Sequence, residues 1–199
     1  MKKIVFIILG IVLPMTAFSQ CDPASVSEFQ KKMNAEFADP EHSPLKEKDI
    51  KVFQSLDFFP VDMKYCVTAR LVKTTKEKPF AMPTTGKRTP LYVKYGELFF
   101  TLDGKEFKLA IYRNLELAKR DEFKKHLFLP FTDLTSGVES YGGGRYIDLE
   151  IPEGDTMTID FNKAYNPYCA YNEGYSCPIP PQENDLKTEI KAGVKAFHK

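Results

Sequence analysis

Hydrophobic residues recur at helical spacing near the start of the chain. Between residues 24 and 38, four apolar side chains lie three or four positions apart, with lysine and glutamate between them. This spacing predicts one amphipathic helix, which the Asp39-Pro40 pair would end. The apolar positions of this helix are Val26, Phe29, Met33 and Phe37.

Further along the chain the pattern changes to the alternation that is typical of strands. Asp103-Gly104 lies between two such segments and is the strongest hairpin signal, while Gly96 is expected to divide or bend the segment that contains it. The charged residues 114–125 predict one or two helical turns. The tail after residue 185 fits either a helix or a strand, and we favour a strand that ends near Gly193. The expected strand segments are 62–71, 79–88, 91–102, 107–112, 127–131, 146–151 and 157–161.

This succession of short strands and turns predicts a mainly β fold. The two architectures that fit are a β-sandwich and a partly open barrel, each with the N-terminal amphipathic helix and minor helical flanks. No internal break is long enough to separate two domains, so residues 20–199 are expected to form a single domain.

Residues 1–19 have the features of a signal peptide. Two lysines precede an apolar run over residues 4–15, and the Ala17-Phe18-Ser19 sequence fits a cleavage site that leaves Gln20 first. The run is shorter than the ~20 residues that a membrane-spanning helix needs, so we expect no stable membrane insertion rather than a retained anchor. The protein is therefore predicted to be exported, either periplasmic or secreted. Lipid anchoring through Cys21 is the less favoured alternative, because the bulky Gln20 precedes it.

Charge and cysteine content limit the possible partners, disulfides and metal sites. The chain carries 28 basic and 27 acidic side chains, which argues against a nucleic-acid partner. In an oxidising compartment the closely spaced Cys169 and Cys177 are expected to form a disulfide. Four cysteines allow three pairings, so the states of Cys21 and Cys66 stay open. Cys66 lies in a strand pattern and could instead be a buried free thiol. No histidine lies near the Cys169/Cys177 pair, and we predict neither a metal site nor a cofactor.

Polar motifs are concentrated in the last third of the chain. Gly142-Gly143-Gly144 with Arg145 could cradle an anionic group, or it could form a glycine-rich hairpin in which Arg145 pairs with Asp133 or Asp160. Ser136 could be a nucleophile, but the surrounding residues favour a turn. The asparagines could line a polar pocket or bind calcium, although their spacing is not that of an EF-hand. The candidate ligand-binding residues are Asp133, Ser136, Arg145, Asp160, Asn162 and Asn166.

Four ordered motifs in this region resemble those of a family grouped as domain of unknown function 1684. The motifs are F-x-D-x-T-S-G, Y-x-x-G-R-Y, D-F-N-x-A-x-N-P-x-C-A and C-P-x-P-P-x-E-N-x-L. The resemblance covers roughly residues 40–193. The chain departs from the family after Ala192-Gly193, where a glutamate is usual and Val194 stands here. The resemblance implies an extent and a family, but no activity.

Three functions remain open on the sequence alone. The first is a β-rich domain that binds a small anionic or polar ligand at the Gly-rich and Asn-Pro-Cys loops. The second is a hydrolase of an envelope component that uses Asp133 or Asp160 as general acid or base. The third is a purely structural or interaction domain, in which the motifs only tie long loops to the β framework.

Overall fold

The computed structural model describes residues 21–197, so the predicted signal peptide at residues 1–19 lies outside the described residues. The helices are α1 (Pro23–Ala38) and α2 (Glu47–Ile50), with several short 3-10 turns. The strands are β1 (Cys66–Lys73), β2 (Phe80–Ala81), β3 (Leu91–Leu102), β4 (Lys105–Asn114), β5 (His126–Phe131), β6 (Arg145–Glu150) and β7 (Thr156–Asp160).

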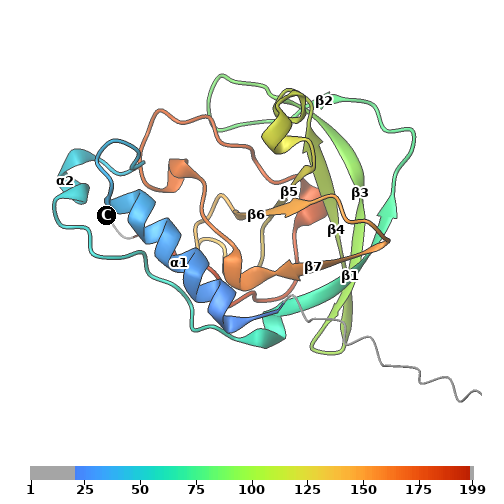
Figure 1. Ribbon diagram of the computed structural model, residues 1–199, viewed down its shortest axis with the longest axis horizontal. Coiled ribbons are helices and arrows are strands. Elements are labelled where there is room, and N and C mark those ends of the chain that lie inside the picture. The colour runs from blue at the N-terminus through green and yellow to red at the C-terminus, as the bar shows by residue number, and fades with distance from the viewer. Residues whose placement is uncertain (1–20, 198–199) are drawn as a thin grey trace, which may run out of the picture.

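The strands form one antiparallel sheet in the order β6-β5-β4-β3-β1-β7, with the short β2 paired to β3. The sheet curls into a half-barrel, and Figure 1 shows β6 and β7 facing each other across its open side, next to α1. The protein is therefore mainly β, as predicted. Of the two expected architectures it has the partly open barrel, because a single curled sheet encloses its own core.

The core lies on the concave face of this sheet. Alternate residues of each strand point inward, as the two-residue period of a strand requires; Leu98, Leu109, Leu127 and Ile159 have no exposed surface. A second apolar cluster covers part of the convex face, where Tyr92, Phe128 and Tyr146 pack together.

Local signals in the sequence predicted the helix and the hairpin correctly. Asp22 caps α1 by accepting a hydrogen bond from the Ala24 amide at 3.0 Å. Asp103 and Gly104 both have positive φ, as a tight two-residue turn between β3 and β4 requires. Gly96 does not divide its segment. It lies at a bulge within the continuous strand β3, where a Cβ would approach the Val72 carbonyl oxygen to 2.6 Å.

The strand favoured for the tail is wrong. After a 3-10 turn at Gln182–Asn184, residues 185–197 contain only isolated bridges, such as Phe58 with Val194. The physical reason is that side chains take up the backbone groups of the tail: Arg145 donates to the Ile190 carbonyl, and Asp133 accepts from the Ile190 amide. No neighbouring strand is needed to satisfy these groups.

The structure contains two disulfides. Cys169 is bonded to Cys177, as predicted, and Cys21 is bonded to Cys66. Of the alternatives left open for Cys66, the disulfide is therefore present and the free thiol is not. The partner, 45 positions away, lies just before α1, whose packing brings it beside the start of β1. Cross-linking a loop of this length stabilises the fold by about 4 kcal/mol on the loop-entropy estimate, and it occupies the sulfur that a lipid anchor would need.

No helix within the described residues is long and apolar enough to cross a membrane.

Candidate functional site

The side chain of Arg145 lies fully buried at the start of β6. Its guanidinium donates to Asp133 Oδ2 at 2.7 Å, to the Ile190 carbonyl at 2.8 Å and to the Ala192 carbonyl. The rings of Phe59 and Phe131 lie 5.8 and 5.3 Å from the guanidinium carbon. Burial lowers the pKa of Arg145, and the Asp133 carboxylate opposes that shift. This charge is thus held by internal partners, as in the hairpin alternative derived from the sequence.

Asp133 and Ser136 belong to the same buried cluster. Asp133 Oδ1 accepts from the Thr135 amide at 2.8 Å, and the Ser136 hydroxyl accepts from the Asp133 amide at 3.2 Å. These are the bonds of a turn stabilised by its own side chains. Gly144 completes the connection to β6 with φ +86°, where a Cβ would lie 2.6 Å from the Phe131 carbonyl oxygen. Glycine at position 144 thus allows the backbone conformation that leads into β6.

Asp160 and Asn162 form a second group at the end of β7. Asp160 Oδ1 accepts from both the amide and the side-chain nitrogen of Asn162, which also bonds the backbone of Asp62. Asp160 Oδ2 is buried and has no hydrogen-bond partner among the described residues, with Lys163 Nζ 4.0 Å away. It borders a cavity of about 360 Å³ between β6 and β7.

Asn166 lies in a third place, where its side-chain nitrogen donates to the Lys195 carbonyl at 2.8 Å. The six predicted residues are thus divided among three groups, and within the described part of the chain no hydrogen bond joins one group to another. Only Asn166 borders the larger cleft of the molecule.

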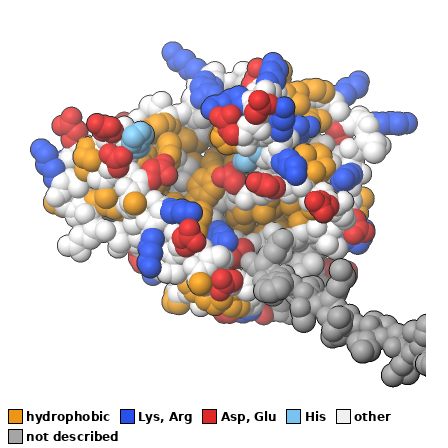
Figure 2. All heavy atoms as spheres, viewed as in Figure 1, with side chains coloured by type: hydrophobic (Ala, Val, Ile, Leu, Met, Phe, Trp, Pro, Cys, Tyr) orange, Lys and Arg blue, Asp and Glu red, His pale blue; other side chains and the backbone are white. Residues whose placement is uncertain are grey.

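That larger cleft, which we call the aromatic cleft, has a volume of about 520 Å³. It lies between α1, the convex face of β5 and β6, and the segment 165–178. In Figure 2 hydrophobic side chains are visible inside a hollow at the centre of the face that is shown. Its size falls within the range of small-molecule sites. The aromatic side chains that line it are Phe29, Phe37, Tyr92, Phe128, Tyr146, Tyr165, Tyr168 and Tyr175.

Buried rings form the floor of the aromatic cleft. Phe128 and Tyr146 come from neighbouring strands and meet edge to face, with ring centres 4.8 Å apart. Tyr92 packs on the other side of Phe128 at 5.6 Å. Each of these three side chains is at most 6% exposed, so the floor is fixed by core packing.

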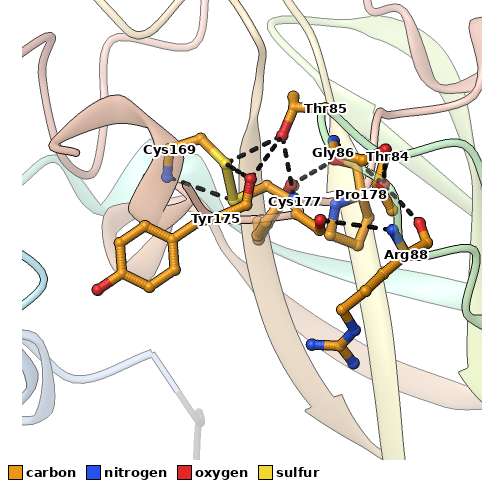
Figure 3. The surroundings of a disulfide bond; sticks show 10 residues. Thr84, Thr85, Gly86, Arg88, Cys169, Tyr175, Cys177 and Pro178 are labelled. Carbon is orange, nitrogen blue, oxygen red and sulfur yellow. Dashed lines mark hydrogen bonds between the residues drawn. A yellow bond between two sulfur atoms is a disulfide. The ribbon is translucent and has the colours of Figure 1, made fainter. Parts of the chain in front are cut away.

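Two exposed rings form the rim. Tyr168 and Tyr175 lie 5.3 Å apart, and each is 37% exposed. The Cys169–Cys177 disulfide joins the segments that carry them, and Figure 3 shows Tyr175 beside this bond. Thr85 anchors the disulfide, because its hydroxyl contacts Cys169 Sγ at 3.0 Å and accepts from the Cys177 amide at 3.1 Å.

Tyrosine hydroxyls in the cleft already have acceptors within the protein. Tyr165 donates to Asp148 Oδ2 at 2.7 Å, Tyr168 donates to Glu36 Oε1 at 2.5 Å, and Tyr146 donates to the Pro178 carbonyl. Burial raises the pKa of all three hydroxyls, and the adjacent carboxylates raise those of Tyr165 and Tyr168 further. These phenols therefore stay neutral at physiological pH and hold the rings in fixed orientations.

The charged lining consists of Glu36 from α1, Asp148 from β6 and Arg88 from the segment after β2. The second carboxylate oxygen of Asp148 forms a hydrogen bond with His126 Nε2 at 2.8 Å. Arg88 is exposed. No group of three or more metal-ligating side chains occurs within residues 21–197.

Sequence reasoning missed this cleft. Its rings come from segments as far apart as Phe29 and Tyr175, and each segment alone is indistinguishable from ordinary core. Three of the four tyrosines in residues 165–175 line the cleft and the fourth, Tyr171, is fully buried in the core, so their spacing alone carries no signal.

Comparisons with known proteins give a family and a fold neighbour. The model of the family described as Protein of unknown function (DUF1684) matches residues 51–195. An uncharacterized protein of Haloarcula marismortui, whose structure was determined in solution by NMR, is 32% identical with a TM-score of 0.68. The match covers 86% of this chain and 92% of that one. No curated protein matches.

Proposed function

The chain belongs to the DUF1684 family, and we propose that it acts as an exported domain that binds a small molecule in the aromatic cleft. The observation that carries this proposal is the convergence of eight aromatic side chains from separate segments on one open cleft of about 520 Å³. A mostly apolar recess with a few fixed polar groups is the usual form of a small-molecule site.

The proposal moves the site away from most of the motif residues. Asn166 keeps a place in the cleft wall, and Asp160 borders the neighbouring smaller cavity. Arg145, Asp133, Ser136 and Asn162 instead hold the framework, because the chain itself engages most of their polar atoms. The exception is Arg145 Nε, which is buried and has no hydrogen-bond partner among the described residues. A buried guanidinium with four internal acceptors has little to offer a ligand from outside.

Binding is favoured over hydrolysis for a similar reason. Asp133 is tied to Arg145 in a buried ion pair, which removes it as an acid or base for an external substrate. Asp160 has a buried oxygen with no hydrogen-bond partner in residues 21–197, but no histidine or serine from these residues borders its cavity. The arrangement therefore supports recognition of a ligand more than covalent chemistry.

Two disulfides are compatible with the oxidising compartment that export implies. Location in the periplasm or outside the cell stays part of the proposal.

The test is ligand-observed NMR with a set of small neutral aromatic compounds, such as phenol and indole. We expect saturation transfer to the compounds with the wild type, and binding at least about tenfold weaker after Tyr168→Ala or Tyr175→Ala, because a stacking surface is lost. The matched control is Phe99→Ala. This ring is also partly exposed, but it lies on β3 outside the cleft and stacks with Arg70 at 4.9 Å. Equal binding by all four proteins would rule the cleft out as the site.

A further inference from the structure

The chemical class of the ligand can be inferred from which polar atoms the aromatic cleft leaves available. The hydroxyls of Tyr146, Tyr165 and Tyr168 are directed to acceptors of the protein. The Asn166 side-chain nitrogen is likewise engaged by the Lys195 carbonyl. Among the lining side chains, donors are left on Arg88, Tyr175 and Ser176. A ligand in the cleft thus meets ring surfaces and carboxylate oxygens more often than donors.

The two carboxylates lie on opposite walls. Glu36 projects from α1 and Asp148 from β6, and each accepts a hydrogen bond from a tyrosine of the segment between them. Both side chains retain solvent contact, and each carboxylate oxygen has a second lone pair. Among the described residues, the Tyr165 hydroxyl and His126 are the only groups hydrogen-bonded to the carboxylate of Asp148.

Aromatic rings and carboxylates favour the same kind of partner. The face of a ring attracts a cation through its quadrupole, most strongly where water is excluded. Two carboxylates and one guanidinium give the lining a formal charge of −1. The single cation, Arg88, is exposed at the edge beside Tyr92, and no lysine borders the cleft.

We propose that the aromatic cleft binds an organic cation, with a substituted ammonium group held against the tyrosine rings between Glu36 and Asp148. This inference rests on the proposed function and reverses the charge that the sequence had suggested for the ligand. It concerns molecules whose positive charge is covered by methyl or methylene groups, because such cations lose little hydration when they enter a cage of rings.

The experiment compares three molecules of the same shape and different charge. Choline is the cation, 3,3-dimethylbutan-1-ol is its neutral carbon analogue, and 3,3-dimethylbutanoate is the anion. Dissociation constants are measured by NMR titration with the wild type. We expect choline to bind about tenfold more tightly than the alcohol, and the anion to bind more weakly than both.

Variants separate recognition of the charge from general attraction. Glu36→Gln and Asp148→Asn should each weaken choline binding several-fold and leave the alcohol unchanged. Glu28→Gln is the matched control on α1, because Glu28 is exposed, paired with Lys32 at 2.8 Å and outside the cleft. Tyr168→Leu keeps apolar bulk but removes the ring face, so it should reduce the preference for choline over the alcohol.

Each other result has a definite meaning. Equal affinity for the three molecules, or tighter binding of the anion, would overturn the cation inference and leave the proposed function standing. Failure of all three to bind a protein that does bind neutral aromatic compounds would also overturn the inference alone. Failure of the aromatic compounds and of the three analogues would remove the proposed function together with the inference.

Discussion

The cluster around Arg145 and Asp133, which we call the Arg145 cluster, and the aromatic cleft consist of different kinds of side chain. The cluster consists of charged and polar groups that are wholly buried and bonded to one another. The cleft consists of rings, three of whose hydroxyls are satisfied internally, around a space that is open to solvent. Residue types that look chemically active therefore hold the fold together here, while residue types that look like core form the recess.

The difference follows from the cost of burying polar groups. A buried guanidinium is tolerated only when its donors find acceptors, so its neighbours are fixed by that need. Such a cluster produces a conspicuous motif in the sequence without leaving room for a ligand. The face of an aromatic ring has no hydrogen-bond donors or acceptors that must find partners. A ring can therefore line an open recess without leaving a buried polar group unsatisfied.

The largest expected effect is on stability, from Arg145→Ala. The substitution would leave Asp133 as an uncompensated buried charge and two carbonyls without donors, at a cost of about 3–5 kcal/mol in the free energy of unfolding. Chemical denaturation followed by circular dichroism measures this loss. Arg120→Ala is the control, because Arg120 is 62% exposed and its contacts with Glu122 and the Phe123 ring lie at the surface, and it should change stability by less than about 1 kcal/mol.

The contrary outcome would invert the comparison between the two regions. If Arg145→Ala denatures at the same concentration as the wild type but no longer binds the cleft's ligands, the motif would be the site after all.

A smaller effect is expected from the disulfide at the cleft rim. Replacing Cys169 and Cys177 by serine should lower the free energy of unfolding by about 2–3 kcal/mol, the loop-entropy contribution of so short a loop. It should also weaken ligand binding, because Tyr168 and Tyr175 would lose their fixed separation.

The second disulfide provides the matched control. Replacing Cys21 and Cys66 by serine removes a cross-link between residues 45 positions apart. This change should lower the free energy of unfolding by about 4 kcal/mol. This bond lies away from the rim, so ligand binding by the folded fraction should be unchanged. If both double variants lose binding equally, the rim has no special role, and the comparison between framework and cleft would need revision.

Features of the structure that depend on neighbouring residues could be predicted from the sequence. The helix from residue 23 and the turn at Asp103-Gly104 follow from neighbouring residues, and both were predicted. The pairing of Arg145 with Asp133 was among the alternatives, because a buried charge needs a partner and few candidates were near. The family was identified correctly from ordered motifs.

What could not be predicted depends on contacts between distant segments. The disulfide of Cys66 requires the position of Cys21 in space, and the irregular tail depends on Arg145 satisfying its carbonyls. The cleft depends on α1 lying beside β5 and β6, which places Phe29 near Phe128 around one space. Hydrophobic periodicity records that a residue is buried, but not against which segment it packs.

The last effect is confined to alkaline pH, because the contribution of the tyrosines to stability does not change below their ordinary pKa, about 10. The pKa is raised mainly by burial at six of the ten tyrosines, and four of these line the cleft: Tyr92, Tyr146, Tyr165 and Tyr168. A raised folded-state pKa contributes stability that is fully present below pH ~10 and is lost as pH rises towards the folded value. The free energy of unfolding should therefore decline above pH ~10.

Ultraviolet absorbance of tyrosinate measures this directly. At pH ~11 the native protein should lack the signal of these six tyrosines, and denaturant should restore the full amplitude of ten. Tyr165→Phe and Tyr168→Phe should each leave the native signal unchanged and reduce only the signal released on unfolding. If either variant lowers the native signal instead, its hydroxyl ionises in the folded protein, and the cleft is not held by neutral phenols as the comparison with the Arg145 cluster requires.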